Sequence, residues 1–156
     1  MRGRHAVGIR FMGSIFFAVL ALGCSGDEPG AELQPPPECP GGTPQVSYAR
    51  VYREVFSTAC VTCHRPQGQA PTDLSTFAAG YANTVNQPSR YGSLARVTPN
   101  ELGASVLYIK MIGGSPPYSG RGGQSVGGVM PPGGTVLTSQ TQKDLVRDWI
   151  CSGAAP

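Results

Sequence analysis

The sequence lacks an apolar run long enough to cross a membrane as a helix. Its best candidate, residues 11–22, is almost wholly apolar but only 12 residues long, whereas a transmembrane helix needs about 20. The run follows a basic start that contains Arg2, Arg4 and Arg10 and no acid, and small residues come after it. Such an order is typical of an export signal. We therefore expect residues 1–23 to be a signal peptide and the rest of the chain to be exported.

Beyond this signal the chain also lacks an excess of positive charge. The whole sequence has 12 Lys and Arg against 9 Asp and Glu. Three of the arginines lie in the first ten residues, and all the acids lie after residue 24, so the remaining chain carries no net charge. A neutral chain gives no support to nucleic-acid binding, and we expect no nucleic-acid partner.

Histidine is scarce, and the one histidine beyond the signal directly follows a Cys-x-x-Cys pair. His5 lies in the signal, whereas His64 closes the run Cys60-Val61-Thr62-Cys63-His64. This pattern is typical of haem attachment, because two thiols at this spacing can add to the two vinyl groups while the imidazole binds iron from one face. The sequence therefore predicts one covalent haem c.

Zinc binding and thiol chemistry are alternative uses of the same residues. Cys39, Cys60, Cys63 and Cys151, or three of them with His64, could form a tetrahedral zinc site, but no recognisable second ligand pair is present. A thioredoxin-like redox pair is expected within a βαβ pattern, which this sequence does not show. We therefore favour haem attachment over both alternatives.

Methionine is also scarce after the signal, where Met111 and Met130 are the two present. Met111 falls within the apolar pattern of a predicted helix, where methionine usually fills the core. Met130 lies in a loop in which Pro131 and Pro132 restrict the backbone and flanking glycines permit close approach to a ring. A thioether placed there can bind iron, so we predict Met130 as the second axial ligand. Met111 and an open or water-bound site remain the alternatives.

Three further cysteines lie outside the haem motif. Cys24 ends the run LALGC, which resembles a bacterial lipoprotein signal in which this cysteine is lipidated; an ordinary secretory signal cut nearby is the alternative. Ser25, in place of Asp after the lipidated cysteine, favours the outer membrane by analogy with such lipoproteins. Cys39 and Cys151 are left over, and in an oxidising compartment they favour a disulfide, with free thiols and metal ligands as alternatives.

The exported part divides into a tether and one domain. Residues 24–44 are rich in Pro, Gly and acids and cannot bury much surface, which predicts an extended tether. Residues 45–156 form the domain, with apolar patterns typical of helices and no segment that indicates a strand. The helical patterns cover residues 48–60, 73–85, 105–112 and 139–153. We therefore predict a mainly α domain with one modest core.

The last helix has the clearest boundaries. Ser139 and Gln142 form a Ser-x-x-Gln capping box, and Gly153 follows as a stop signal. Trp149, the sole tryptophan, falls on the apolar stripe and is expected in the core. By contrast, residues 113–129 contain seven glycines and no periodicity, so we expect a long loop there that is mobile or functional.

From about Tyr48 onward the chain resembles the single-haem class I cytochrome c domains of bacterial lipoproteins and exported multidomain proteins. The matching segments are residues 60–64, 73–75, 96–97 with 105–110, 130–132 and 148–154. The resemblance implies a class I cytochrome c-like fold, with the N- and C-terminal helices crossing beside the haem. It also implies attachment through Cys60 and Cys63, and His64 and Met130 as the axial ligands.

A haem with both axial positions filled by protein suits one-electron transfer and argues against catalysis, so the expected function is an electron carrier and not an enzyme. By the same resemblance, the carbonyl of Pro71 would accept the ring N–H of His64. Expected partners are redox proteins, with the lipid anchor holding the domain at a membrane facing the periplasm. A five-coordinate haem peroxidase or gas sensor, and an accessory haem subunit of a membrane complex, are the alternatives. Arg65, Arg96 and Lys110 would meet propionates or a partner, or be solvated charges.

Overall fold

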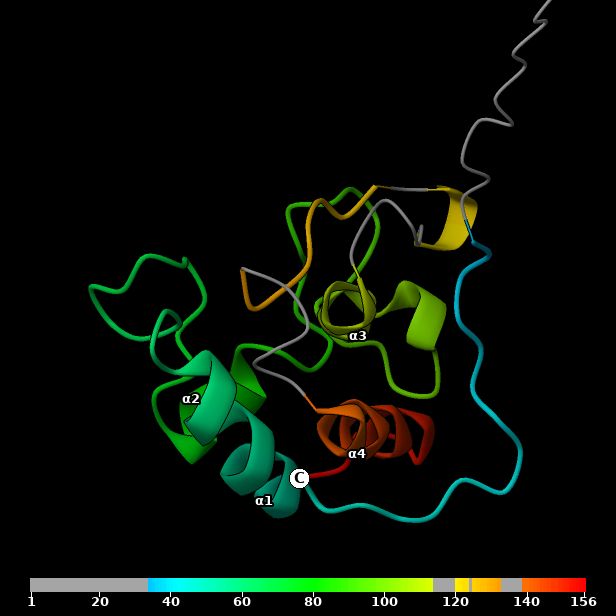
Figure 1. The fold of residues 1–156 in the computed structure, drawn as a ribbon, viewed down its shortest axis with the longest axis horizontal. Helices are drawn as coiled ribbons and strands as arrows, with labels where there is room; N and C mark the ends of the chain where they lie inside the picture. The colour runs from blue at the N-terminus through cyan, green and yellow to red at the C-terminus, as the bar shows by residue number, and fades with distance from the viewer. Residues whose placement is uncertain (1–33, 114–119, 124, 133–138) are drawn as a thin grey trace, which may run out of the picture. The chain divides into compact units, whose positions relative to one another are not determined.

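The structure is a computed structural model that describes residues 34–113, 120–123, 125–132 and 139–156 (Figure 1). The backbone clusters into two units, Met1–Gly30 and Ala31–Pro156, and the first lies outside the described residues. The expected signal peptide and the lipidation site at Cys24 therefore also lie outside them. Within the described part, none of the helices combines the length and the apolar character that a membrane span requires.

The described residues are mostly helical, which confirms the prediction of a mainly α domain. In chain order the elements are α1 (Tyr48–Val51), η1 (Tyr52–Cys60), α2 (Phe77–Ala82), η2 (Leu102–Ala104), α3 (Val106–Ile112), η3 (Arg121–Gly123) and α4 (Gln140–Cys151). Strand pairing in this part of the chain is limited to isolated bridges, such as that between Val85 and Val97. The second helix is shorter than expected, because Thr76 caps it and accepts a hydrogen bond from the N–H of Ala79 at 3.1 Å.

The first helix changes its winding on the way to the Cys-x-x-Cys segment. It begins as α1 and continues as η1, whose backbone bonds span five residues, as in the 3.0 Å bond from the N–H of Val61 to the carbonyl of Phe56. Side-chain donors occupy carbonyls of this helix: the hydroxyl of Thr58 and the amide of Gln142 both donate to Glu54, at 2.9 and 2.7 Å. Because the Glu54 carbonyl accepts these side-chain hydrogen bonds, the wider helical turn does not leave it without a donor.

The core forms where α4 meets the first helix and α3. Figure 1 shows α4 beside both, and contacts join α4 to α1 and to α3. Trp149 is fully buried, as predicted, and its ring lies 5.3 Å from that of Tyr48 between centroids. Tyr48 in turn meets Phe56 and Tyr81, at 5.8 and 5.1 Å. This aromatic packing fixes the first helix, and therefore the Cys-x-x-Cys segment at its end, against the last helix.

The last helix has the boundaries that the sequence predicts. The hydroxyl of Ser139 accepts the N–H of Gln142 at 3.2 Å, and the side chain of Gln142 accepts the N–H of Ser139 at 2.8 Å. Gly153 follows the helix with φ of +102°, a left-handed conformation that suits glycine after a helix end. Both ends of α4 are therefore set by local hydrogen bonding.

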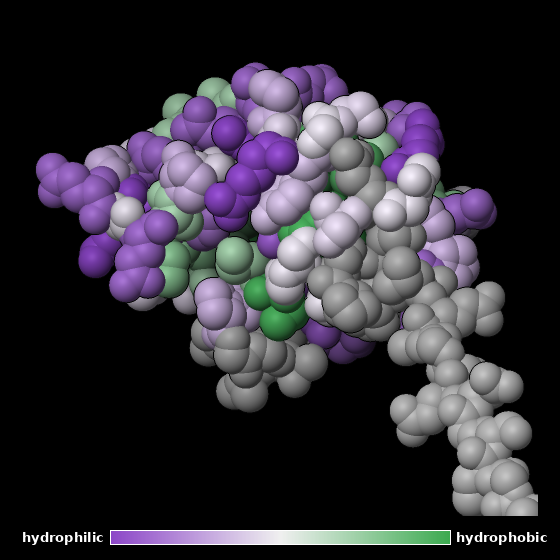
Figure 2. Space-filling model, turned by 90° about the horizontal axis from the view of Figure 1, so that it is seen from above, coloured by the Kyte–Doolittle hydropathy of each residue, from purple (hydrophilic) through white to green (hydrophobic). Residues whose placement is uncertain are grey.

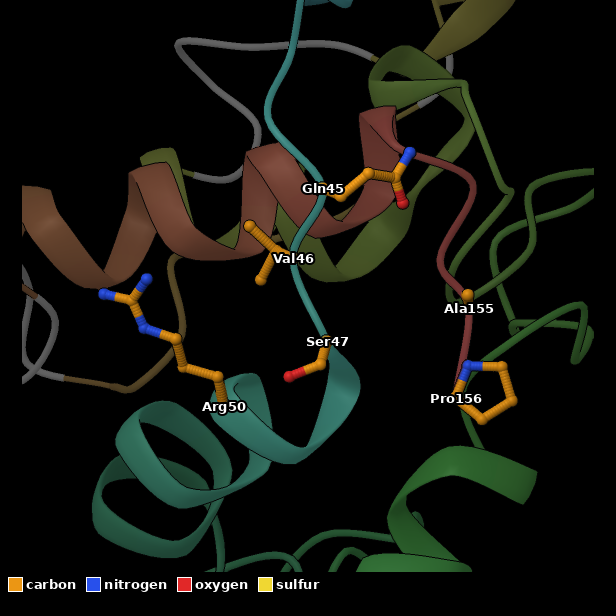
Figure 3. A pocket seen from close by; sticks show the side chains of 6 residues that line it. All are labelled: Gln45, Val46, Ser47, Arg50, Ala155 and Pro156. Carbon is orange, nitrogen blue, oxygen red and sulfur yellow. The ribbon is translucent and has the colours of Figure 1, made fainter.

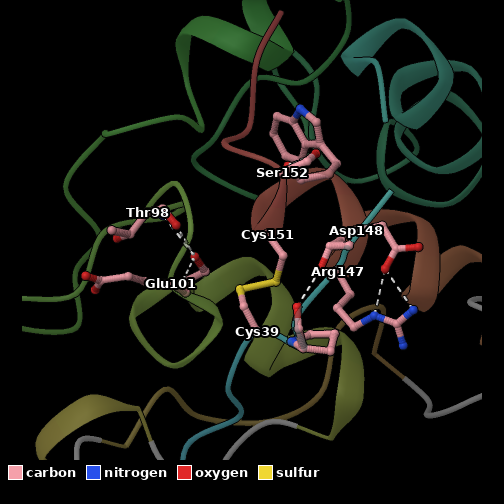
Figure 4. Close-up of a disulfide and its surroundings, with 11 residues drawn as sticks. Cys39, Thr98, Glu101, Arg147, Asp148, Cys151 and Ser152 are labelled. Carbon is pink, nitrogen blue, oxygen red and sulfur yellow. Dashed lines mark hydrogen bonds and ion pairs between the residues drawn. A yellow bond between two sulfur atoms is a disulfide. The ribbon is translucent and has the colours of Figure 1, made fainter. Parts of the chain in front are cut away.

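A disulfide joins Cys39 to Cys151 at the end of α4 (Figure 4). The sequence left a disulfide, free thiols and metal ligands open for these two cysteines, and the structure shows the disulfide. The segment before it packs closely, because a Cβ added at Gly103 would lie 2.8 Å from the Cβ of Pro36. Next to the disulfide, Arg147 forms ion pairs with Asp144 and Asp148, each at 2.8 Å. The second half of the expected tether is therefore held on the domain.

Part of the glycine-rich loop is packed and not free. Val126 is fully buried and clusters with Leu94, Val106 and Ile109. Earlier in the loop, Arg121 forms an ion pair of 2.8 Å with Glu101. Residues 114–119 and 124 lie outside the described residues. The described part of this loop is therefore anchored on the domain by the Val126 side chain and by the ion pair of Arg121.

The surface seen in Figure 2 is mainly polar, with apolar residues in small separate areas. Phe77 is the large hydrophobic side chain that the described residues leave exposed, at 44 %. Figure 3 shows a shallow hollow of about 450 Å³ between the start of α1 and the last residues, lined by Val46, Arg50 and Pro156 among others. The hollow lies at the beginning of the first helix, whereas the Cys-x-x-Cys segment lies at its other end.

Candidate functional site

The Cys-x-x-Cys-His segment forms a single tight turn where η1 ends. The N–H groups of Cys63 and His64 both donate to the carbonyl of Cys60, at 3.2 and 3.0 Å. The chain then folds back, so that Leu74 donates to the carbonyl of His64 at 2.8 Å and Ala70 to that of Cys63 at 3.2 Å. The backbone on both sides of the two cysteines is therefore fixed by hydrogen bonds.

The ring of His64 is held by a backbone carbonyl. Its Nδ1 lies 3.0 Å from the carbonyl oxygen of Thr72, not that of Pro71, so the expected acceptor is off by one residue. A carbonyl can only accept, which assigns the proton to Nδ1 and leaves a lone pair on Nε2. Burial lowers the pKa of His64, against the opposing effect of the bond to Thr72, and the charge of Arg96 lowers it as well. The ring is therefore neutral near pH 7.

Cys60 and Cys63 are both free thiols and half-buried. Cys60 lies against the helix that carries it, with its Sγ 3.8 Å from the carbonyl oxygen of Val55. Burial raises the pKa of the Cys60 thiol to about 12, and the neighbouring Cys63 adds to this rise. Cys60 is therefore protonated at neutral pH.

Arg96 supplies positive charge beside this turn. One of its terminal nitrogens donates to the carbonyl of Asn83 at the end of α2, at 2.6 Å. Its charge reaches the imidazole of His64, whose pKa it lowers. Sequence reasoning treated Arg96 as one of three basic residues without a defined place. The structure assigns it to the site, which no local pattern indicates because its anchor lies 13 residues away.

The two methionines have separate environments. Met111 is buried in the core at 3 % exposure, where a methionine within a helical pattern was expected. Met130 is half-buried, and its N–H donates to the carbonyl of Lys110 in α3 at 2.9 Å. The loop that carries Met130 is therefore placed by α3.

The expected haem c cofactor is contradicted by the arrangement of donors. Among the described residues, no group of three or more His, Cys, Asp or Glu side chains could hold a metal ion. The haem prediction is corrected on this finding, which also removes the zinc alternative for the described part of the chain.

The axial roles expected for His64 and Met130, and attachment through Cys60 and Cys63, depend on that haem. What the structure brings together is a dithiol, a neutral imidazole and the charge of Arg96. Comparison with protein-family models, with curated proteins and with solved structures gives no match.

Proposed function

We propose that this chain is an exported redox protein that exchanges electrons with protein partners through the sulfurs of Cys60 and Cys63. The observation that carries the proposal is the state of the cysteines. Cys60 and Cys63 are free thiols on one turn, whereas Cys39 and Cys151 of the same chain are joined. The free pair is therefore a source of electrons, because two thiols that form a disulfide release two electrons and two protons.

The burial of Cys60 gives the two thiols different roles. Cys63 attacks a disulfide of the partner as a thiolate, forms a mixed disulfide and releases one partner thiolate. Cys60 then attacks the Cys63 sulfur and gives its proton to the second partner sulfur, which leaves as a thiol, so that a Cys60–Cys63 disulfide remains. The partner gains the two electrons that this chain loses.

Such a domain acts as a carrier and not as an enzyme, and its partners are redox proteins. We also propose that Cys24 carries the lipid that anchors the chain, facing the periplasm, with the outer membrane favoured by Ser25. The proposed scaffold is a class I cytochrome c-like fold with crossing first and last helices. This is supported by the bond from Gln142 to the Glu54 carbonyl and by the contact of Tyr48 with Trp149.

The test is reversible oxidation of the full chain, expressed in a bacterium that exports and matures cytochromes. The protein is equilibrated in buffers of graded thiol–disulfide ratio, its free thiols are alkylated, and the product is weighed by mass spectrometry. We expect alkylation of two cysteines, Cys60 and Cys63, to disappear together in one reversible transition. A Cys39→Ser, Cys151→Ser variant is the matched control, and its transition should remain.

Three results would overturn the proposal. One is a Cys60–Cys63 pair that stays reduced in every buffer while both thiols are accessible to the alkylating reagent. Another is a mass increase matching a tetrapyrrole bound to these cysteines, together with visible absorbance, because the sulfurs would then be thioethers and unable to exchange. A Cys63→Ser variant that still shows the same two-thiol transition would also contradict the assignment.

A further inference from the structure

A second cluster of polar side chains lies away from the cysteines, where a short loop meets α3. The side chain of Lys110 has its Nζ 4.9 Å from the ring centroid of Tyr91, and the guanidinium carbon of Arg90 lies 5.5 Å from the same centroid. Burial on its own raises the pKa of Tyr91, but hydrogen bonding and charge from Lys110 and Arg90 outweigh it, so the phenol has a lowered pKa. Both cations therefore act on one phenol oxygen.

The loop that carries Arg90 and Tyr91 is held in place by its own hydrogen bonds. The hydroxyl of Ser89 donates to the carbonyl of Leu94 at 2.7 Å and accepts the N–H of Tyr91 at 3.0 Å. Leu94 is buried in the small core cluster with Ile109 of α3, against which Tyr91 packs. The cluster is therefore preorganised and does not depend on flexible chain for its shape.

No carboxylate neutralises this cluster within the described part of the chain. Ion pairs there involve Arg50, Arg53, Arg121 and Arg147, each with an Asp or Glu. Neither Arg90 nor Lys110 forms such a pair; Lys110 donates instead to the carbonyl of Gly128 at 3.1 Å. Two positive charges beside one phenol, with no carboxylate paired to them among the described residues, favour a bound anion.

Gly127 lies beside the cluster. Its φ is +72°, which favours glycine, and a Cβ there would approach the Tyr91 hydroxyl at 3.5 Å and Lys110 Nζ at 3.7 Å. Gly128 follows with no atom within 4 Å of the position of a Cβ. The backbone of glycine residues, which have no side chains, therefore lies beside the phenol oxygen and the ammonium group.

We propose that Arg90, Tyr91 and Lys110 form a binding site for an oxyanion, a carboxylate or a phosphate group. The ammonium and guanidinium groups donate charge-assisted hydrogen bonds to its oxygens, and the protonated Tyr91 hydroxyl donates a third. This site is separate from the thiol chemistry proposed above and does not depend on it.

The test is a titration of the full chain with inorganic phosphate at constant ionic strength, followed by amide NMR of nitrogen-labelled protein. We expect saturable shifts at Arg90, Tyr91 and Gly127, and an affinity weakened about tenfold in Lys110→Gln, because one charge-assisted bond is lost. Lys143→Gln is the matched control, since Lys143 also forms no ion pair within the described residues and lies on α4. Its affinity should equal that of the unmodified chain.

A second variant and a second probe complete the design. Arg90→Gln changes an exposed side chain and should weaken phosphate binding to a similar extent, which keeps the test decisive if Lys110→Gln does not fold. A tetraglutamate peptide that competes with phosphate for the same residues identifies a protein carboxylate as a source of the anion, whereas phosphate binding alone identifies a free ion. Shifts that are absent, or equal in all variants, would overturn the site.

Discussion

A double replacement at Tyr48 and Gly80 tests the packing of the first helix on α2. Tyr48 is fully buried, and its hydroxyl has no hydrogen-bond partner in the described part of the structure. A Cβ at Gly80 would collide with this same oxygen. Without the oxygen, the nearest atoms would be Cδ2 of Phe56 at 3.4 Å and Cζ of Tyr48 at 3.6 Å, which are ordinary contacts.

The expected free energies follow from these contacts. Gly80→Ala alone overpacks the site at a cost of about 2 kcal/mol, reduced by about 1 kcal/mol because alanine favours a helix. Tyr48→Phe removes an unpaired buried hydroxyl and should stabilise the fold by about 1 kcal/mol. The double variant combines the helix preference of alanine with the loss of the unpaired hydroxyl, and it avoids the collision. It should therefore be about 2 kcal/mol more stable than the unmodified chain. If the effects of the two single replacements simply added, the double variant would have unchanged stability.

Urea unfolding followed by fluorescence of Trp149, the sole tryptophan, measures these differences. Gly128→Ala is the matched control, because no atom lies within 4 Å of the position of its Cβ; its effect should simply add to that of Tyr48→Phe. The reasoning would be refuted if Gly80→Ala and Tyr48→Phe were additive. A loss of stability above about 1 kcal/mol in Tyr48→Phe would likewise show that the hydroxyl has a partner.

Three further predictions concern the ends of the domain and the turn after the cysteines. Replacing Cys39 and Cys151 by Ser opens a loop spanning 112 positions and should cost about 2–5 kcal/mol in urea unfolding; an unchanged midpoint would show that non-covalent packing holds the segment. Ser139→Ala removes the acceptor of the first turn of α4 and should cost about 1 kcal/mol, read from the same midpoint. Bonds from Ser75 hold the pKa of Asp73 below its ordinary value, so its stabilisation is present above pH about 4 and lost as the pH falls through the lower folded value. Asp73→Asn should therefore lower stability at neutral pH and lose that deficit in acid; a deficit independent of pH would contradict the assignment.

Local signals predicted the last helix correctly. The capping box of Ser139 and Gln142 acts over three residues, and Gly153 acts at the next helix end, so short-range sequence contains what sets both boundaries. Burial of Trp149 follows from the apolar stripe of the same helix. These features could be predicted because each depends on neighbours in the chain and on a well-understood helix geometry.

The winding of the first helix could not be predicted in this way. Its apolar residues fit the ordinary helical period, and Tyr48, Val51 and Phe56 are buried as that period requires. The wider turn depends in part on the Gln142 amide, which reaches the Glu54 carbonyl from 88 residues away. Such a donor is visible only once the two helices are packed together.

The candidate site was also predictable only in part. The sequence singled out Cys60, Cys63 and His64, and the structure keeps them on one turn. The haem prediction was wrong, because the described residues contain no group of three or more His, Cys, Asp or Glu side chains that could hold a metal ion. The anchor of His64 on Thr72, and the charge of Arg96 beside it, depend on how the chain folds back after the turn.

The disulfide between Cys39 and Cys151 also determines how the domain would bear a mechanical load. A pull on the chain ahead of Cys39, opposed at the residues after Cys151, passes through the covalent link and not through the helices. The chain between the two cysteines then carries none of the tension, and it adds nothing to the extension of the molecule. Such a domain can be held at the end of a stretched tether without being unfolded by it, as long as the disulfide stays oxidised.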